Sequence, residues 1–463
     1  MKIIKKFSGL LLIVATLVLT GQGCGGPSDA EIAAVKPVTL KIWRVFDEAQ
    51  TMQKIMSNYR SLHPNVSFEY RELRINEYKD ELLRAFAEGT GPDIFSIHNT
   101  WVDEYKSLLT PLPPTLTIPY SEIKGSIKKE TVVTLRQEPT ISLRQFKQDF
   151  IDVVVKDAIR AHQLDPRQEA VDRIYALPLS VDTLILYYNK DLLNATGIAE
   201  PPRTWSEFQQ AVIKLTRYDS NDNIVQSGAA LGTSQNVERA FDILSLLMMQ
   251  NGTQMTDARG RATFASGLDD RTVPGALAVQ FYTDFANPTT EVYTWNSEQP
   301  NSFDAFVNGQ TAFFFGYSYH LPLIRSRAQK LRFSSTAMPQ ISLNPEVKQV
   351  NYANYWLEGV AKATPNATWA WDFIQFATGA EQVTNYLEAA NKPTARRALI
   401  GQQTESEDLS VFANQLLTAQ SWYRGRDAIV AEEALLDLID QILEGAEASE
   451  VINTAQNKVN QTL

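Results

Sequence analysis

Residues 173–208 read RIYALPLSVDTLILYYNKDLLNATGIAEPPRTWSEF, and the rest of the chain is organised around this stretch. Pro178 excludes a helix from the apolar run around it, so that run is extended. Residues 183–188 are mainly β-branched, aliphatic and aromatic, which predicts a strand. Gly197 ends the short helix that follows, because glycine adopts a left-handed conformation without a Cβ penalty. Residues 204–207 form a capping box and predict the start of a second helix.

The combination of YALP, YYNKDLL and PPRTWSEF resembles the signature of family 1 extracellular solute-binding proteins. These are the sugar-binding lipoproteins of ABC importers, related to maltose-binding protein. EGTGPDIFSI at 88–97, the segment 302–315 and AWDFIQF at 370–376 resemble further parts of that family in the same order. Without the resemblance, residues 173–208 are also compatible with an ordinary strand–helix–turn–helix unit that binds nothing.

The resemblance covers nearly all of residues 38–463 and implies an α/β fold of the type II periplasmic-binding-protein class. In that fold each of two lobes is a mainly parallel sheet flanked by helices, and the ligand cleft lies between the lobes. Crossovers are expected near Leu179, Gly316 and Trp356, with hinge closure about them. The expected lobes are an N-terminal lobe at 37–181, completed by 318–354, and a C-terminal lobe at 182–317, completed by 355–463.

The chain order supports this fold class independently. A chain of 463 residues is long enough for about two or three domains. Alternating strands and helices predict a parallel sheet covered on both faces. Residues 113–145 contain several prolines and no clear period, which favours a surface insertion, and 146–162 return to helical spacing. The first predicted strands are 38–43, 66–70 and 93–97, and the helices between them are 51–62 and 78–87.

The N-terminus predicts export. Residues 1–23 combine a lysine-rich start with a short apolar run, as in a signal peptide, and the run is too short to span a bilayer. Cys24, the only cysteine, resembles the lipidated residue of a bacterial lipobox, with 24–36 as a tether. Gly21 departs from the leucine preferred there. The alternative is a plain secretory signal beside an unmodified cysteine. We therefore expect an extracytoplasmic protein anchored to the cell membrane by lipid.

Composition narrows the partners. A formal net charge of −10 argues against nucleic acid. The 4 histidines form no cluster in the sequence, so neither a metal nor a cofactor is expected. The resemblance implies a carbohydrate ligand and the permease subunits of an ABC transporter, and we expect a monomer.

A ligand site is expected at the carboxyl ends of the strands, as in open α/β sheets. The ends of strands 38–43 and 93–97 share one rim, and each is followed by polar groups beside an aromatic ring. Aromatic faces and planar polar groups are what a sugar needs. The strand-end rule and the resemblance together select as candidate ligand contacts Trp43, Asp47, Glu48, His98, Asn99, Trp101, Asp182, Gln235, Asn236, Tyr317, Tyr319, Trp356 and Trp422.

Several candidates have a structural alternative. Trp43 could belong to the core, since it ends an apolar strand. Asp47 and Glu48 could cap the following helix. Trp101 could pack beneath its own loop. Asp182 needs a partner if it is buried.

A second class of function is a secreted carbohydrate-active hydrolase, and a third is a scaffold or adhesin without a small ligand. Residues 316–320, GYSYH, nearly match a nucleophile elbow, but His320 replaces the second glycine. A carboxylate pair of the glycosidase type stays open at this stage.

Overall fold

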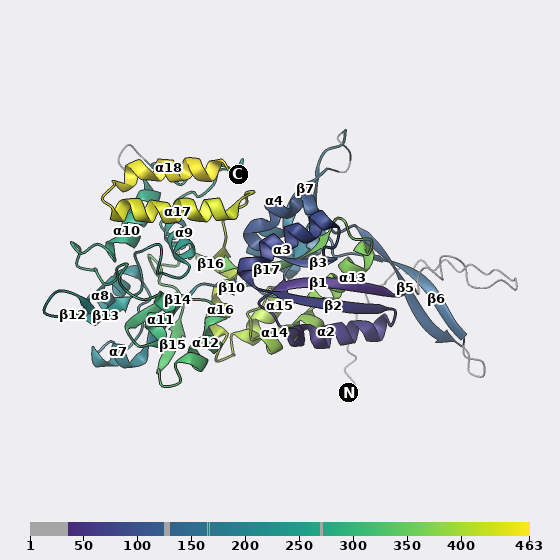
Figure 1. The fold of residues 1–463 in the computed structure, drawn as a ribbon, viewed down its shortest axis with the longest axis horizontal. Coiled ribbons are helices and arrows are strands. Elements are labelled where there is room, and N and C mark those ends of the chain that lie inside the picture. Colours follow the sequence, from purple (N-terminus) through teal and green to yellow (C-terminus); the bar gives the residue numbers. More distant parts are fainter. Residues whose placement is uncertain (1–35, 125–129, 164, 166, 269–271) are drawn as a thin grey trace, which may run out of the picture.

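The computed structural model describes residues 36–124, 130–163, 165, 167–268 and 272–463. Two lobes lie side by side along the long axis of the molecule (Figure 1). Each lobe has its own buried core, one containing Ile94 and Trp371 and the other containing Phe313 and Leu438. The expected two-lobed α/β fold is therefore confirmed.

The N-terminal lobe is built on a six-stranded mixed sheet. Its strands are β1 (Val38–Val45), β2 (Val66–Leu73), β3 (Ile94–His98), β4 (Leu109–Thr110), β9 (Ala176–Leu177) and β17 (Trp356–Ala361). The strand order is β2-β1-β3-β17-β4, and β9 also pairs with β17. As predicted, β1 is parallel to β2 and β3, but β17 is antiparallel to β3, β4 and β9.

Helices flank this sheet because their apolar residues recur at helical spacing. In the first, Met52, Ile55 and Tyr59 are buried along one side. The predicted helix at 146–162 is instead two short helices and a strand, with a break at Phe150. The elements of this lobe outside its sheet are α2 (Ala49–Leu62), α3 (Ile75–Glu88), α4 (Val102–Tyr105), α5 (Leu143–Asp149), α6 (Asp152–Ala158), β7 (Ile159–His162), β8 (Val171–Ile174), α13 (Ala367–Thr378), α14 (Ala380–Ala390) and α15 (Arg397–Gln403).

The C-terminal lobe contains a five-stranded sheet of β11 (Ile185–Asn189), β12 (Arg217–Tyr218), β13 (Ile224–Ala229), β14 (Thr311–Gly316) and β15 (Phe333–Thr336). Only β13 and β14 are parallel among its pairs, so the expected mainly parallel sheet is wrong for this lobe. The helices of this lobe are α7 (Lys190–Ala195), α8 (Trp205–Leu215), α9 (Ala240–Gln250), α10 (Pro274–Asp284), α11 (Ser302–Val307), α12 (His320–Arg327), α17 (Ala428–Leu443) and α18 (Ala448–Asn460).

A third, three-stranded sheet joins the lobes. It consists of β10 (Asp182–Thr183), β16 (Asn351–Asn354) and β18 (Ala419–Gln420) in the order β10-β16-β18. The chain leaves the N-terminal lobe through β10, returns through β16, and leaves again after β18. We call these three strands the hinge sheet.

Two of the expected crossovers lie at the hinge sheet, near Leu179 and Trp356, but the one at Gly316 does not. After β14 the chain stays in the C-terminal lobe, because β15 pairs with β11. After β16 it enters the sheet of the N-terminal lobe as β17 and packs against that core as far as Ile400. The helix α16 (Ser410–Gln415) then lies between the lobes, because Phe412 packs with Phe306 of the C-terminal lobe while Ala413 belongs to the N-terminal core. The expected completion of the lobes by 318–354 and 355–463 is therefore wrong in part: 318–350 completes the C-terminal lobe, and 356–403 completes the N-terminal lobe. The last two helices, α17 and α18, do belong to the C-terminal lobe as expected.

The insertion at 113–145 is a long antiparallel hairpin. Its strands are β5 (Thr115–Lys124) and β6 (Glu130–Pro139), which pair in continuous register from Thr115 with Pro139 to Lys124 with Glu130. The hairpin projects from the end of the N-terminal lobe that is far from the hinge (Figure 1). Leu116 and Ile118 are buried at its base. The expected surface insertion is thus ordered as a β-ribbon along these strands.

The predicted capping box at the start of α8 forms, and it can be tested. The Thr204 hydroxyl accepts a bond of 3.2 Å from the Glu207 amide, and the Glu207 carboxylate accepts one of 3.3 Å from the Thr204 amide. Thr204→Ala removes one cap and should lower the free energy of unfolding by about 1 kcal/mol. Urea denaturation measures this effect. Ser206→Ala, at an exposed position of the same turn, should change it by less than half as much; equal losses would contradict the capping role.

Candidate functional site

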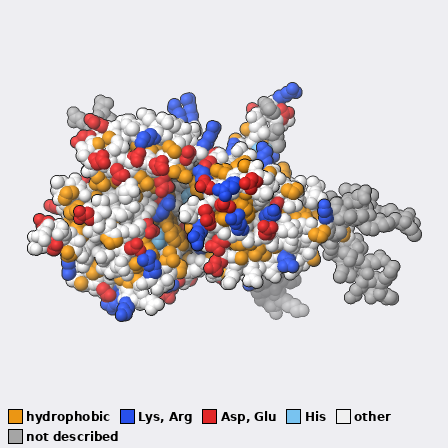
Figure 2. Space-filling model, viewed as in Figure 1, with side chains coloured by type: hydrophobic (Ala, Val, Ile, Leu, Met, Phe, Trp, Pro, Cys, Tyr) orange, Lys and Arg blue, Asp and Glu red, His pale blue; other side chains and the backbone are white. Residues whose placement is uncertain are grey.

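The candidate site lies between the lobes. The strands β1 and β3 end at the edge of their sheet where β17 begins, directly after the hinge strand β16. Figure 2 shows a groove between the two lobes, with hydrophobic side chains along its wall. The predicted rim at the ends of β1 and β3 therefore faces the hinge and the C-terminal lobe.

Aromatic rings gather at this rim around Trp356, the first residue of β17. Its ring centroid lies 5.2 Å from that of Trp101, 5.3 Å from His98 and 6.1 Å from Phe46, and all three contacts are edge-on. We call these four side chains the aromatic corner. Register explains the arrangement, because Trp356 pairs directly with His98 across β17 and β3.

Trp101 is partly covered by its own lobe. Its ring stacks on Tyr105 at 5.9 Å with an interplanar angle of 24°, and the Lys79 ammonium lies 5.6 Å from its centroid. Lys79 in turn forms an ion pair of 2.5 Å with Glu104. Trp101 therefore presents mainly an edge to the groove.

Behind the corner lies a buried ion cluster that holds the loop after β1. Asp47 is 4% exposed and pairs with Arg44 and Lys392, both at 2.7 Å, while the Tyr386 hydroxyl donates to it at 2.9 Å. Arg44 also pairs with Glu358 at 3.0 Å. Burial opposes ionisation of Asp47, but Arg44 and Lys392 outweigh it and lower its pKa. Asp47 thus positions the loop from inside the lobe.

Two other candidates from this loop lie away from the groove contacts. Trp43 is 7% exposed, belongs to the core, and is covered by the Arg71 guanidinium at 4.6 Å. Glu48 is exposed at the N-cap of α2, and its backbone carbonyl accepts from Thr51. The expected side-chain cap by Glu48 does not form.

A chain of polar contacts crosses from one lobe to the other at the floor of the groove. His98 Nε2 bonds to the Asn354 amide oxygen at 3.0 Å, and the Asn354 amide donates to Asp242 at 3.1 Å. Asp242 also accepts two bonds of 2.8 Å from Arg239 and one of 2.6 Å from Tyr317. Burial lowers the pKa of His98 to about 4, so its imidazole is neutral at physiological pH. We call His98, Asn354, Asp242 and Arg239 the polar chain.

Tyr319 is the exposed aromatic of the C-terminal lobe at this site. It is 46% exposed and stacks on the buried Tyr317 at 6.1 Å with an interplanar angle of 16°. Its ring also lies 4.0 Å from that of His320, and burial raises the pKa of its hydroxyl. Of the two predicted tyrosines, Tyr319 can reach a ligand, while Tyr317 supports it.

Asp182 uses its carboxylate within the hinge. One oxygen accepts from the Ser318 amide at 2.9 Å and from the Ser318 hydroxyl at 2.6 Å, and the other accepts from the Thr183 amide at 2.9 Å. Burial raises the pKa of Asp182 to about 6. The partner that a buried Asp182 requires is therefore Ser318, on the loop after β14.

The remaining candidates of the C-terminal lobe have structural roles. Asn236 bonds through its amide nitrogen to the carbonyls of Asn296 and Gln299, and through its oxygen to Thr233 and Trp295. Trp422 is 3% exposed and donates to Ser245 at 2.9 Å. Gln235 is exposed and donates to Asp440 at 3.3 Å.

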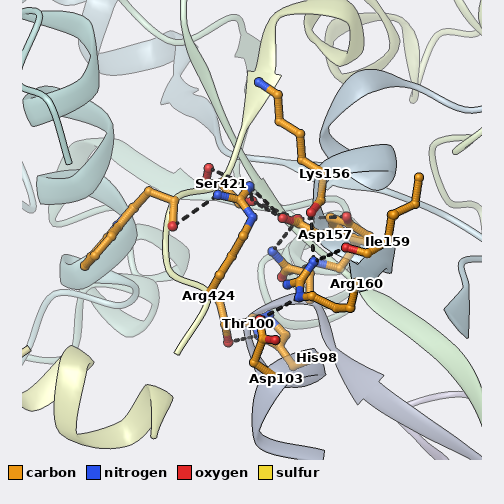
Figure 3. Close-up of polar contacts among 12 residues, drawn as sticks. His98, Thr100, Asp103, Lys156, Asp157, Ile159, Arg160, Ser421 and Arg424 are labelled. Atoms are coloured by element: carbon orange, nitrogen blue, oxygen red, sulfur yellow. Dashed lines mark hydrogen bonds and ion pairs between the residues drawn. The ribbon is translucent and has the colours of Figure 1, made fainter. Parts of the chain in front are cut away.

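Asn99 belongs to a hydrogen-bonded cluster around Asp157 that holds the last crossover against the N-terminal lobe. Its amide donates to Asp157 on α6 at 3.2 Å, and the Tyr355 hydroxyl donates there at 2.9 Å. Ser421 and Arg424, which follow β18, also bond to Asp157, at 2.7 Å and 2.8 Å respectively (Figure 3). Asp157 is fully buried, so this carboxylate is a fixed anchor for the chain as it leaves the lobe.

The near-match to a nucleophile elbow does not build a hydrolytic triad. Ser318 does lie at a strand-to-helix turn, but it is 3% exposed and its hydroxyl donates to Asp182. His320 accepts from the Tyr317 amide through Nδ1 and pairs with Glu238 through Nε2, so both ring nitrogens are engaged away from Ser318. A nucleophile needs a base within hydrogen-bond reach, and this geometry directs the histidine elsewhere.

Two further observations limit the chemistry of the described residues. They contain no group of three or more His, Cys, Asp or Glu side chains placed to hold a metal ion. In the same part of the chain, no helix combines the length and the apolar character needed to cross a bilayer. Cys24 and the predicted signal peptide lie outside the described residues.

Two lobes, a hinge sheet and an aromatic-lined groove define a solute-binding protein rather than a single-domain fold with a surface site. The family of bacterial extracellular solute-binding proteins matches residues 54–405, and the chain belongs to this family. A probable ABC transporter-binding protein of Deinococcus radiodurans is 24% identical over 225 residues, which make up 48% of this chain and 51% of that protein. The match thus spans about half the length of this curated relative.

Solved structures share the fold at low identity. A cyclic α-maltosyl-1,6-maltose binding protein from Arthrobacter globiformis has a TM-score of 0.70 at 18% identity, over 92% of this chain and 98% of that chain. A solute-binding protein from Thermotoga lettingae bound with α-D-tagatose has a TM-score of 0.66 at 18% identity, over 91% and 99%. A substrate-binding protein from Listeria monocytogenes in complex with cycloalternan has a TM-score of 0.67 at 15% identity, over 92% and 99%.

Four residues at the groove were missed by sequence reasoning: Phe46, Arg239, Asp242 and Asn354. Phe46 directly follows the first strand and could have been selected by the strand-end rule. Asn354 immediately precedes the third expected crossover. Arg239 and Asp242 stand at the start of α9, an ordinary helix in the sequence, and only the fold brings them to the hinge.

Asp182 generates a prediction that separates its structural role from ligand binding. Asp182→Asn replaces one acceptor by a donor that faces Ser318 or Thr183, which should lower stability by about 1–3 kcal/mol at pH 7. The folded protein holds the Asp182 proton more tightly than the unfolded chain. The tighter proton binding by Asp182 therefore adds fully to the free energy of unfolding below the ordinary pKa of an aspartate. This stabilisation is lost as the pH rises through about 6, the pKa of Asp182 in the folded protein. Urea denaturation should thus show the stability gap between wild type and variant widening from pH 7 to pH 4.5. A gap independent of pH would contradict this assignment.

Proposed function

We propose that the protein captures a carbohydrate, of oligosaccharide size, in the groove between its lobes and delivers it to the permease subunits of an ABC importer. The observation that carries this proposal is the junction of the aromatic corner with the polar chain, because Trp356 contacts His98 and His98 bonds to Asn354. A sugar needs both apolar ring faces and planar polar groups. Structures of the same fold bound with tagatose or cycloalternan, and that of a cyclic α-maltosyl-1,6-maltose binding protein, support the same ligand class.

The proposed capture uses groups from both lobes. The sugar packs a C–H face against the Trp356 ring of the N-terminal lobe, while its hydroxyls bond to Asn354, Arg239 and the Tyr319 hydroxyl. Arg239 and Tyr319 belong to the C-terminal lobe, so full contact requires the lobes to approach one another. Rotation about the hinge sheet would bring the two sets of groups together and exclude water from the ligand.

Family membership places the chain outside the cytoplasm. We further propose that it works there as a monomer, held to the cell membrane by a lipid on Cys24. No catalytic step is part of this function, since the groups at the groove are engaged in hydrogen bonds that hold shape rather than in a nucleophile–base pair.

Calorimetry with maltotetraose, mannobiose and tagatose tests the ligand class, and Trp356→Ala tests the site. Loss of an aromatic platform should weaken binding by about 2 kcal/mol, or about thirtyfold. Trp369→Ala is the matched control, because Trp369 is a partly buried tryptophan of the same lobe. It packs on His63, which lies between α2 and β2. The control should lower the thermal midpoint and leave affinity within about threefold. Equal affinity loss in both variants would contradict a site at Trp356, and turnover of any probe would contradict a binding function.

Cys24→Ser tests the anchor. If Cys24 carries the lipid, the variant should move from the membrane fraction to the soluble fraction of the cell, because a serine hydroxyl cannot take the thioether-linked lipid. Immunoblotting of fractionated cells measures the distribution. A variant that stays with the membrane to the same extent as the wild type would overturn this proposal.

A further inference from the structure

Phe46 has a backbone conformation that phenylalanine rarely adopts. Its φ is 68°, in the left-handed region, and among the described residues the other non-glycine residues with positive φ are Asp222, Arg239 and Asn391. Asp and Asn tolerate this region better than other side chains, whereas a bulky residue there is strained. Glycine would make the same turn without the Cβ penalty. The large side chain at position 46 therefore opposes the local backbone.

Both neighbours of Phe46 are fixed inside the lobe. Val45 is 3% exposed at the end of β1, where it pairs with Leu73. Asp47 is held by Arg44 and Lys392, and its backbone carbonyl accepts a bond of 2.6 Å from the Tyr70 hydroxyl. With the residues on either side turned inward, the Phe46 side chain is directed outward. The buried ion cluster thus sustains the strained turn.

The exposed ring does little for the core. Phe46 is 58% exposed, and its recorded ring contact is the edge-on one with Trp356 at 6.1 Å and 74°. Two nearly perpendicular rings form a corner with apolar walls on two sides. Trp356 also contacts His98, where the polar chain begins, so one side of this corner continues into hydrogen-bonding groups.

Backbone strain at a non-glycine residue is retained where function requires it. The groove contains a second residue with such a backbone conformation. Arg239, with a φ of 60°, lies in the polar chain on the other lobe. Asp222, by contrast, lies in an exposed turn between β12 and β13. The two strained residues that are neither Asp nor Asn are therefore both at the groove.

We infer that Phe46 is a specificity-determining platform of the ligand site, which stacks on the C–H face of a pyranose ring. The inference rests on the proposed function and narrows its ligand class to sugars with a contiguous apolar ring face. The backbone strain is the structural means of directing the ring into the groove, and the ion cluster of Arg44, Asp47 and Lys392 holds it there.

Replacing Phe46 by glycine separates this role from a structural one, because it removes the ring and the strain together. Phe46→Gly should weaken binding by about tenfold to thirtyfold, while the thermal midpoint without ligand stays the same or rises by about 2 °C. Phe46→Tyr should keep affinity within about threefold. Calorimetry uses maltotetraose or mannobiose, whichever binds the wild type more tightly, and differential scanning fluorimetry gives the midpoint.

Asp222→Gly is the control, since it relieves a φ of 61° far from the aromatic corner. It should not change affinity. Unchanged affinity in Phe46→Gly, or a fall in its midpoint by more than about 5 °C, would overturn the inference and leave the proposed function intact. Absence of binding by the wild type to either probe would overturn the proposed function itself, and this inference with it.

Discussion

The antiparallel pairing of β17 with β3 is the contact on which both the groove and the hinge depend. It sets Trp356 directly opposite His98. The imidazole of His98 thereby also reaches the side chain of Asn354, 256 positions further along the chain at the end of β16. Two residues further along β17, Glu358 lies opposite Ser96, which donates to it, and reaches Arg44 on β1. A single strand register therefore places the aromatic corner, begins the polar chain and closes the buried ion cluster. A slip by one residue would turn each of these side chains to the other face of the sheet.

The charges inside the N-terminal lobe serve geometry more than net stability. Arg44, Asp47, Glu358 and Lys392 carry two charges of each sign, and the first three are almost fully buried. The desolvation of such groups offsets most of their mutual attraction, so a buried pair is a weak source of stability. Its strict directional demands, however, fix the loop between β1 and α2. Carboxylates have the same use at the hinge: the buried Asp157 of α6 holds Arg424 after β18, and the half-buried Asp182 of β10 holds Ser318.

Periodicity and capping residues in the sequence predicted the elements whose formation depends only on neighbouring residues. The first three strands and first two helices of the N-terminal lobe, the capping box at Thr204 and the two-lobed fold class are confirmed, because periodicity and capping act within a few residues. The assignment of returning strands to lobes failed, because β15 and β17 are both short and their sequences do not state which sheet they join. Only pairing with β11 or β3 decides this.

The residues of the site also divide into those that the sequence could predict and those that depend on distant contacts. The strand-end rule selected His98 and Trp101, since it depends on sheet topology alone. The structure places both against Trp356, a candidate that was chosen beside the family resemblance. It could not tell that Asp47, Asn99 and Asn236 use their polar groups within their own lobes, because those partners come from distant segments such as Lys392 and Asp157. Phe46 was not predicted, because the outward direction of its side chain depends on its φ angle, which neither composition nor spacing in the sequence indicates.

The chain passes between the lobes three times at the hinge sheet, and this topology also determines the order in which the lobes can fold. During synthesis from the N-terminus, β1, β2 and β3 emerge long before β17, which supplies the neighbour of β3. Until then the sheet of the N-terminal lobe has an open edge of unpaired N–H and C=O groups, which is a template for association with other chains. Neither lobe is a continuous segment: the N-terminal lobe waits for β17, and the C-terminal lobe waits for α17 and α18 at the end of the chain. The fold therefore favours a chain that is kept extended until all of it is available, as export across a membrane before folding would allow.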